Sequence, residues 1–297
     1  MPGRRRTIAD FKISSAPYMD PFVTAVVLVS SLMHATWNAV VKGAEDGLVT
    51  QAAVVLGGAL YAIPFLFGVP FPNAEAWIYL GLSALIHCAY FAALAAAYGF
   101  GDLGFIYPIA RGSGPVLVAG LSALTIGELL SPAQFAGVSI ICLGVLALAV
   151  TGRSGSGLKG FLFALAVTCL ISGYSLADGI GVRVSEMPFS YIPWLIALQA
   201  IPFTLFTLWR RGWRIDRLIR GQARTIWLGG FLIGGSYGMA MWAFYAESLS
   251  VVMALRETAV IFGAIIGAIV FKEAFGRPRI LASILIASGA VWLNIAA

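Results

Sequence analysis

Long, unbroken apolar runs follow one another along the chain, separated by charged residues or by clusters of Gly, Pro and Asn. Each run has about the 20 residues that a helix needs to cross the hydrocarbon core of a membrane. Strands of a membrane β-barrel would be short and would alternate apolar with polar positions, so helices fit better. We therefore predict an all-α integral membrane protein with ten transmembrane helices. The predicted helices occupy residues 21–41, 48–69, 76–98, 103–124, 132–150, 160–180, 187–209, 225–246, 248–271 and 280–296.

Composition agrees with this prediction. Hydrophobic residues make up 60% of the chain and charged residues 11%, whereas soluble domains are about half apolar and a quarter charged. The connections leave no room for a soluble domain, and the first run lacks the cleavage site of a signal peptide. Cys88, Cys142 and Cys169 have no paired spacing, so we expect packing roles for them and neither a metal nor a cofactor.

The charged residues inside the apolar runs recur at a fixed offset. Arg111 and Arg256 are separated by 145 residues (256 − 111). The same offset relates three further pairs, namely Asp102 with Glu247, Glu128 with Glu273, and Gly144 with Gly289. This recurrence indicates a duplication of a five-helix unit.

Five helices is an odd number, so the second unit must enter the membrane upside down relative to the first. Inverted repeats are characteristic of secondary transporters, whose cargo binds near the midplane at the repeat interface. We expect two inverted five-helix repeats around a central cavity. The expected parts are a basic tail (1–20), a first repeat (21–152), a linker (153–159) and a second repeat (160–297).

Arg111 and Arg256 each lie about nine residues into a run, roughly 13 Å deep at 1.5 Å per residue. A charge at that depth is costly and usually functional. Helix breakers surround Arg111, including Pro108 and Pro115, and irregular backbone at this depth must face protein or water. Two interpretations remain open. The arginines bind cargo, or they pair with acids such as Asp178 and Glu257 (also the candidates for carrying protons) to hold the halves together.

Other polar and aromatic residues fall at helical spacing on the apolar runs and are candidates to line the cavity, either by binding an amphipathic solute or by ordinary packing. The candidate binding residues are His34, Trp37, Asn38, His87, Tyr90, Tyr107, Arg111, Tyr174, Tyr237 and Arg256. For the two histidines, a binding role is favoured over ordinary packing, since a buried imidazole needs partners and can titrate near neutral pH.

Basic residues give conflicting evidence on orientation. Four Lys or Arg precede the first helix and only Lys42 follows it closely, which predicts cytoplasmic termini by the positive-inside rule. Over the whole chain, however, the loops on the opposite side hold twelve Lys or Arg against five. Six arginines lie in 210–224, which we interpret as an amphipathic helix on lipid headgroups rather than a nucleic-acid site.

Three segments resemble the drug/metabolite transporter superfamily of EamA type: residues 31–42 (SLMHATWNAVVK), residues 98–111 (YGFGDLGFIYPIAR) and Gly127-Glu128. The resemblance covers residues 20–296. It implies ten helices in two inverted halves around a central cavity, cytoplasmic termini, and movement of small metabolites, most often export across a bacterial inner membrane. The nearest branch in style is that of the YddG-like exporters of aromatic and other amino acids.

Several functional classes can be weighed against these features. A carrier explains the repeat, the midplane charges and the lack of a soluble domain. An importer or a carrier of lipid-linked or other metabolites would share the fold, and a headgroup flippase would need basic rims on a laterally open cavity. A membrane enzyme lacks a catalytic constellation here, and no nucleotide-binding motif is present. We expect a non-enzymatic exporter that moves small amphipathic metabolites, above all amino acids, by alternating access. Its expected partners are the cargo and membrane lipids, and a monomer is compatible with this function.

Overall fold

All regular secondary structure in the described part of the chain is helical. The computed structural model describes residues 20–97, 109–151, 157–213, 220–272 and 276–295. The helices are α1 (Pro21–Lys42), α2 (Gly47–Leu66), α3 (Ala74–Ala97), α5 (Gly114–Ile126), α6 (Pro132–Thr151), α7 (Gly157–Val184), α8 (Pro188–Arg210), the π-helix η2 (Thr225–Gly229), α10 (Gly230–Ala246), α11 (Leu249–Arg256), α12 (Ala259–Val270) and α13 (Arg277–Ile295).

Length and hydropathy identify a membrane protein. Seven helical segments of the described chain are long and apolar enough to cross a membrane. They are Pro21–Lys42, Gly47–Leu66, Ile109–Ile126, Leu158–Val184, Pro188–Arg210, Leu249–Val270 and Arg277–Ile295, with a shorter apolar helix at Pro132–Ala147. Many large apolar side chains point outward, for example Phe67 at 89% exposure and Leu124 at 85%. Such a surface suits lipid, because hydrocarbon solvates it and water does not.

The helix starts follow from short-range hydrogen bonds. Asp20 accepts from the N–H of Phe22 at 2.7 Å before Pro21, and Asn73 accepts from the N–H of Ala76 at 2.8 Å. These acceptors satisfy donors that the first turn of a helix leaves open. Ser131 and Gln134 form a reciprocal capping box at the start of α6.

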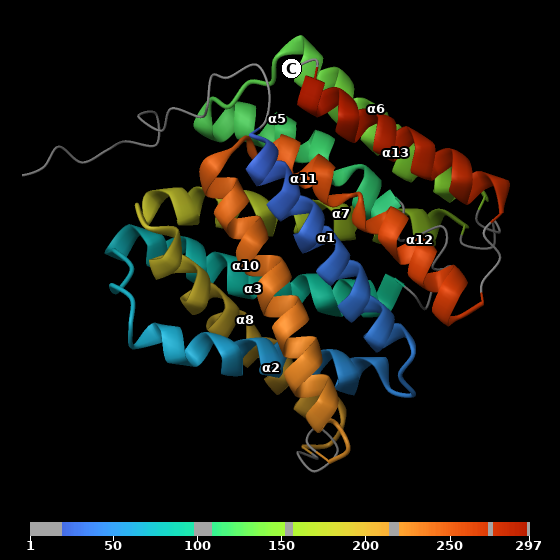
Figure 1. Ribbon diagram of the computed structural model, residues 1–297. Coiled ribbons are helices and arrows are strands. Elements are labelled where there is room, and N and C mark those ends of the chain that lie inside the picture. Colours follow the sequence, from blue (N-terminus) through green and yellow to red (C-terminus); the bar gives the residue numbers. More distant parts are fainter. Residues whose placement is uncertain (1–19, 98–108, 152–156, 214–219, 273–275, 296–297) are drawn as a thin grey trace, which may run out of the picture.

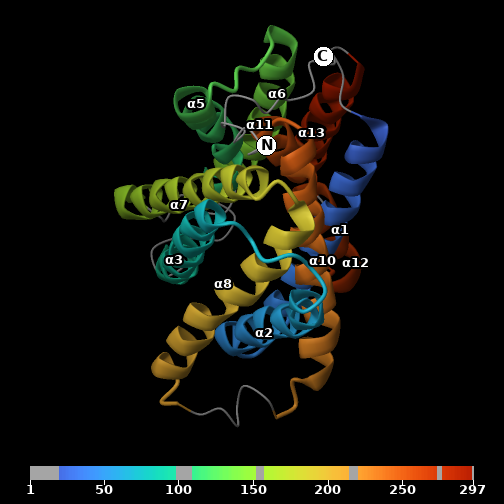
Figure 2. The ribbon, with the colours of Figure 1, turned by 90° about the vertical axis from the view of Figure 1, so that its left-hand side faces the viewer.

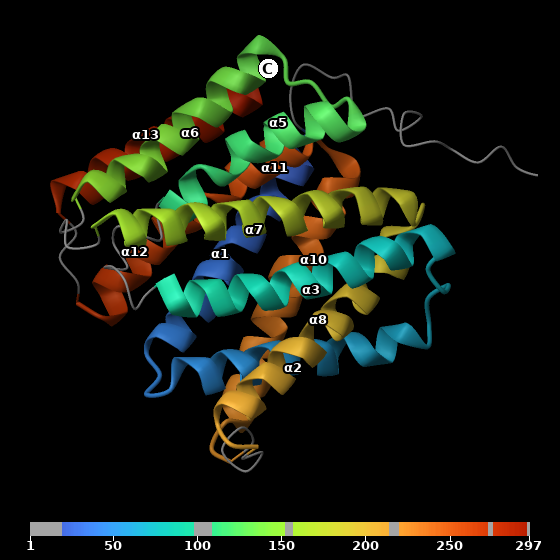
Figure 3. The ribbon, with the colours of Figure 1, turned by 180° about the vertical axis from the view of Figure 1, so that it is seen from behind.

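The helices form a bundle with pairs at its two ends. Figure 1 shows α6 beside α13 at one end and α2 near α8 at the other, and both pairs are in contact. Figure 2 shows the same arrangement from the side, with α3, α7, α1 and α10 between these ends. From behind, α3 and α7 lie side by side (Figure 3), and they too are in contact.

Both arginine-bearing spans are broken where the arginine lies. Helical residues 109–112 end at a turn at Ser113, and α5 begins at Gly114. In the other span, α11 ends at Arg256, a turn covers Glu257 and Thr258, and α12 follows. The prolines and glycines near Arg111 predicted the first break. The second has no such signal in the sequence.

Some expectations lie outside the described residues. They include Tyr107, the repeat partners Asp102 and Glu273, and the centre of the basic segment expected to lie on headgroups, residues 214–219. The described flanks of that segment are turns at 211–213 and 220–221.

Candidate functional site

Arg111 is bound to an acid of the other half of the chain. Its Nη2 lies 2.8 Å from Oε1 of Glu257, and its Nε donates to Oε2 at 3.2 Å. Both residues are buried, Arg111 at 7% exposure and Glu257 at 2%. A two-point contact of this kind matches the planar guanidinium to the carboxylate. The structure thus contains the pairing that one interpretation of the sequence foresaw, and the forked face of Arg111 is engaged within the protein.

Arg256 is equally buried, at 7% exposure, but its surroundings differ. No hydrogen bond or ion pair from the described residues engages its guanidinium, and its Nε is a buried donor without an acceptor. The guanidinium lies 5.8 Å from the ring centre of Tyr237, within range of a cation–π contact. Leaving a buried cationic donor without an acceptor is costly, so Arg256 is the cationic group best able to receive an anionic ligand.

Four of the predicted aromatic and imidazole side chains form one cluster between α3, α7 and α10. His87 stacks on Tyr174 with 3.9 Å between ring centres, and it meets Tyr237 edge-on at 5.6 Å. Tyr90 packs edge-on against Tyr174 at 5.5 Å. The Nδ1 of His87 lies 3.0 Å from the carbonyl oxygen of Ser83. Tyr237 belongs both to this cluster and to the surroundings of Arg256.

Asp178 lies one turn beyond Tyr174 on α7 and is fully buried, at 0% exposure. Its Oδ1 accepts a hydrogen bond from the hydroxyl of Tyr191 at 3.4 Å, and its Oδ2 accepts a short one from Tyr237. Ser83, on α3, lies close to it. No cation of the described residues forms an ion pair with Asp178, and the two groups that hydrogen-bond to it, Tyr191 and Tyr237, are neutral hydroxyls.

The face of α1 that the sequence singled out lies near the arginines. Both Arg111 and Arg256 lie near His34. His34 and Trp37 meet edge-on at 5.1 Å, and the amide of Asn38 donates to the carbonyl oxygen of His34 at 2.7 Å. His34 and Asn38 are half-buried and Trp37 is buried. The residues of α1 are thus brought to the same region, although Asn38 uses a donor on its own helix.

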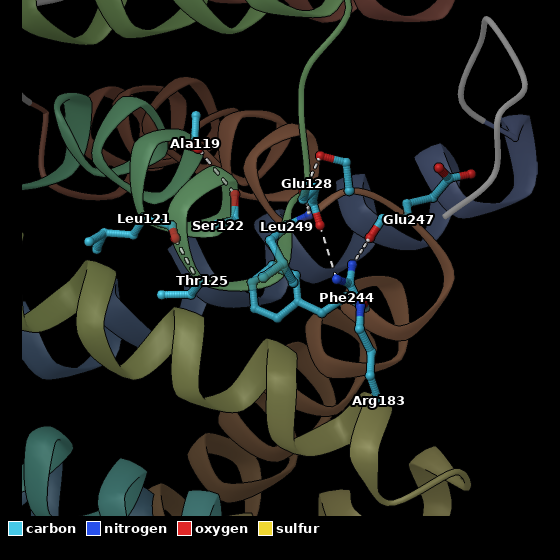
Figure 4. Close-up of polar contacts among 10 residues, drawn as sticks. Ala119, Leu121, Ser122, Thr125, Glu128, Arg183, Phe244, Glu247 and Leu249 are labelled. Carbon is cyan, nitrogen blue, oxygen red and sulfur yellow. Dashed lines mark hydrogen bonds and ion pairs between the residues drawn. The ribbon is translucent and has the colours of Figure 1, made fainter. Parts of the chain in front are cut away.

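A second buried ion pair lies at the end of the molecule where α1 begins. Glu128 follows α5, and its Oε2 lies 3.0 Å from Nη1 of Arg183 at the end of α7. The same guanidinium donates to the carbonyl oxygens of Phe244 at 2.9 Å and Glu247 at 2.7 Å. Figure 4 shows Arg183 reaching between Glu128 and the carbonyl oxygen of Glu247.

The other carboxylate oxygen of Glu128 caps α11. Its Oε1 accepts from the hydroxyl of Ser248 at 2.6 Å and from the N–H of Leu249 at 2.8 Å. Nearby, Asn73 donates to the carbonyl oxygen of Val184 at 2.7 Å. These contacts join the connections after α2, α5, α7 and α10. We call the group Glu128, Arg183 and Ser248 the terminal junction. The sequence marked Glu128 only as one member of a repeated pair, and Arg183 only as a loop charge.

The opposite end carries a looser contact. Arg211, after α8, donates to Asp46, before α2, at 2.9 Å, and both side chains are well exposed. Burial acts to raise the pKa of Asp46, but the hydrogen bonds from Arg211 and from the N–H of Val49 outweigh it and lower that pKa below its ordinary value. In the described residues the buried ion pairs therefore lie in the interior and at the terminal junction, while this end has an exposed one.

The similarity of this chain to known proteins lies in its fold. No family model matches the chain, and no curated protein sequence matches it. One solved structure, described only as "Crystal structure of protein", is similar with a TM-score of 0.70 and 17% sequence identity, over 93% of this chain and 98% of that one. At that identity, the similarity carries the architecture and no activity.

Proposed function

We propose that the protein is a secondary transporter that exports small amphipathic metabolites, above all aromatic or neutral amino acids, across a bacterial inner membrane by alternating access. The observation that carries the proposal is Arg256. It is a buried guanidinium without an acceptor, at the break of a membrane-spanning segment and over an aromatic side chain. Polar groups at a broken helix near mid-membrane are typical of transporter sites.

The carboxylate of the cargo fits Arg256 better than Arg111. Nothing in the sequence distinguished the two arginines, but in the structure Arg111 already contacts Glu257 at two points. A cargo carboxylate at Arg111 would have to displace that acid, whereas at Arg256 it would satisfy an open donor. Tyr237, Tyr174 and His87 provide aromatic surface beside Arg256 for the apolar part of the cargo.

Helix packing supports the proposed inverted duplication. The ten predicted spans can be numbered in chain order, and each span of the first half exchanged with the span five places later in the second half. The pairs of helices that are in contact then map onto other pairs that are in contact. The pair α3 with α7 corresponds to α10 with α1, and α2 with α10 corresponds to α8 with α3. The pairs α2 with α8 and α6 with α13 map onto themselves. The offset-related Gly144 and Gly289 both lie where α6 crosses α13, since an added Cβ would come within 3.0 Å of the facing helix at either position.

Alternating access requires one end to be closed while the other opens. The terminal junction is a candidate for the closed end, because its buried ion pair and cap tie several connections together. The exposed pair of Asp46 and Arg211 offers less resistance at the other end. Together with the proposed cytoplasmic termini, this arrangement would close the cytoplasmic side. Active alkaline-phosphatase fusions at residue 297, with inactive fusions in 210–224, would show the reverse orientation.

The resemblance of residues 31–42, 98–111 and Gly127-Glu128 to EamA-type transporters points to the same function. An importer, or a carrier of lipid-linked or other metabolites, is the alternative within the fold. The test is counterflow. Purified protein in liposomes loaded with one unlabelled solute should accumulate the same labelled solute, and a panel of amino acids, organic acids, amines and sugars identifies the cargo. Accumulation of no amino acid above empty liposomes would contradict the proposal, and accumulation of a lipid-linked solute alone would favour the alternative.

A further inference from the structure

The described interior contains two buried charged residues that form no ion pair with another described residue. The remaining buried charges form pairs, Arg111 with Glu257 and Arg183 with Glu128. Arg256 and Asp178 are left, one positive and one negative, and neither has an ion-pair partner among the described residues. The interior therefore holds one basic and one acidic side chain that have no ion-pair contact with each other.

Tyr237 contacts both centres. Its hydroxyl donates to Asp178, and its ring lies under the guanidinium of Arg256. After donating its proton, the phenol oxygen still has lone pairs that can accept a hydrogen bond. Donation to a carboxylate polarises the phenol and strengthens that oxygen as an acceptor. A cation bound at the phenol oxygen of Tyr237 is therefore attracted by the charge of Asp178, without contacting the fully buried carboxyl group.

We propose that Tyr237, backed by Asp178, is the subsite for the cationic group of the cargo, a primary ammonium, while Arg256 takes the carboxylate. The inference rests on the proposed function and specifies its substrate class. Tyr237 touches the cargo and Asp178 is a positioning residue that acts through it. The cargo is a zwitterion whose two charged groups are close together, as in an α-amino acid.

The other polar groups around Asp178 leave this assignment intact. From α3 it faces Ser83 and, beyond Tyr237, His87, and from α8 it faces Tyr191. Arg256, at the end of α11, is a nearby cation. The packed helix α5 (Gly114–Ile126) carries no titratable side chain. Among the described neighbours of Asp178, none is an acid that could replace it as the source of negative charge.

Charge balance predicts that the site binds a zwitterion more tightly than a simple carboxylate or a simple amine. A zwitterion adds no net charge, and each of its groups meets its opposite. A carboxylate without an ammonium would neutralise Arg256 but leave Asp178 unmatched, and an amine without a carboxylate would do the reverse. Leaving a buried charge unmatched is costly, so both simpler solutes should bind less tightly than the amino acid.

Three matched solutes test the proposal. Phenylalanine, 3-phenylpropanoate (which lacks the ammonium) and phenethylamine (which lacks the carboxylate) would compete with counterflow of labelled phenylalanine in proteoliposomes. In the wild type, phenylalanine should compete best. In Asp178→Asn, the ratio of the apparent affinities of phenylalanine and 3-phenylpropanoate should fall about tenfold, because the hydrogen bond from Tyr237 then goes to a neutral amide instead of a charged carboxylate. Asp46→Asn, the same change in an exposed acid, should leave the ratio unaltered.

A second variant covers the case in which Asp178→Asn fails to fold. Tyr237→Phe removes the phenol oxygen but keeps the ring, and it should shift the ratio in the same direction. An unchanged ratio in both variants would overturn the inference. So would loss of proton-driven accumulation in Asp178→Asn with the ratio intact, because the carboxyl group would then carry a coupling proton instead. If the wild type exchanges no amino acid at all, it is the proposed function that fails, and the subsite with it.

Discussion

The terminal junction allows a quantitative comparison of two ion pairs that differ chiefly in burial. Glu128 and Arg183 approach to 3.0 Å with side-chain exposures of 2% and 7%, whereas Asp46 and Arg211 approach to 2.9 Å with exposures of 38% and 40%. We consider the matched substitutions Glu128→Gln and Asp46→Asn, each of which replaces a carboxylate by an amide of similar shape.

The expected losses differ several-fold. Glu128→Gln leaves the guanidinium of Arg183 buried without its anion, a change that typically costs about 3–5 kcal/mol. The amide oxygen can still accept from the N–H of Leu249, so the cap of α11 is weakened rather than lost. Asp46→Asn breaks a solvated pair, which contributes about 1 kcal/mol at most. The double variant Glu128→Gln with Arg183→Gln should recover part of the loss, since it removes the unmatched charge.

The assay is the free energy of unfolding, measured by denaturant titration of the purified protein in mixed micelles for each single variant and for the double variant. Equal losses for Glu128→Gln and Asp46→Asn would refute the reasoning. A double variant less stable than Glu128→Gln alone would also refute it, because the unmatched charge of Arg183 would then not be the main cause of the destabilisation.

Two further predictions concern single positions. Burial raises the pKa of Glu247, with a further contribution from the charge of Asp20. A carboxyl group shifted in this direction destabilises the fold as pH rises through its pKa, so Glu247→Gln should raise the melting temperature at pH 7 and have little effect near pH 4. Gly57→Ala should destabilise strongly, because the added Cβ would overlap the backbone of Ile226 where α2 crosses η2. Its control is Gly81→Ala, where nothing lies within 4 Å of the added Cβ. This change should be neutral or stabilise the protein by about 1 kcal/mol, since Ala favours helix over Gly. Equal melting temperatures for the two variants would contradict the prediction.

Much of the helical content could be predicted from the sequence, because the length and polarity of a membrane-spanning helix are local properties. Residues 21–41 and 187–209 were expected to be helical, and the structure gives Pro21–Lys42 and Pro188–Arg210. The break beside Arg111 was also foreseen from its prolines and glycines. The break at Glu257 was not, since no helix breaker marks it. Glu257 instead contacts Arg111, a tertiary contact that leaves no trace in the local sequence.

Helical spacing in the sequence indicated several of the interior side chains but not their partners. Helical spacing placed Tyr174 and Asp178 on one face of α7, and both side chains are buried. The sequence could not tell which arginine holds Glu257. It also missed Arg183, because two of that residue's acceptors are backbone carbonyl oxygens. Any residue supplies a carbonyl oxygen, so a partner of this kind leaves no signal in the sequence.

Transport by Arg256→Lys tests the central claim most directly. Lysine keeps the positive charge but cannot bind a carboxylate through two parallel hydrogen bonds. The matched control is Arg211→Lys, the same change at an exposed position. At equal abundance in proteoliposomes, Arg256→Lys should slow counterflow of the confirmed amino acid at least about tenfold, in line with the loss of one hydrogen bond to a charged group, while Arg211→Lys retains the wild-type rate. Counterflow by Arg256→Lys at the wild-type rate would contradict the account, since the cargo carboxylate would then be bound elsewhere.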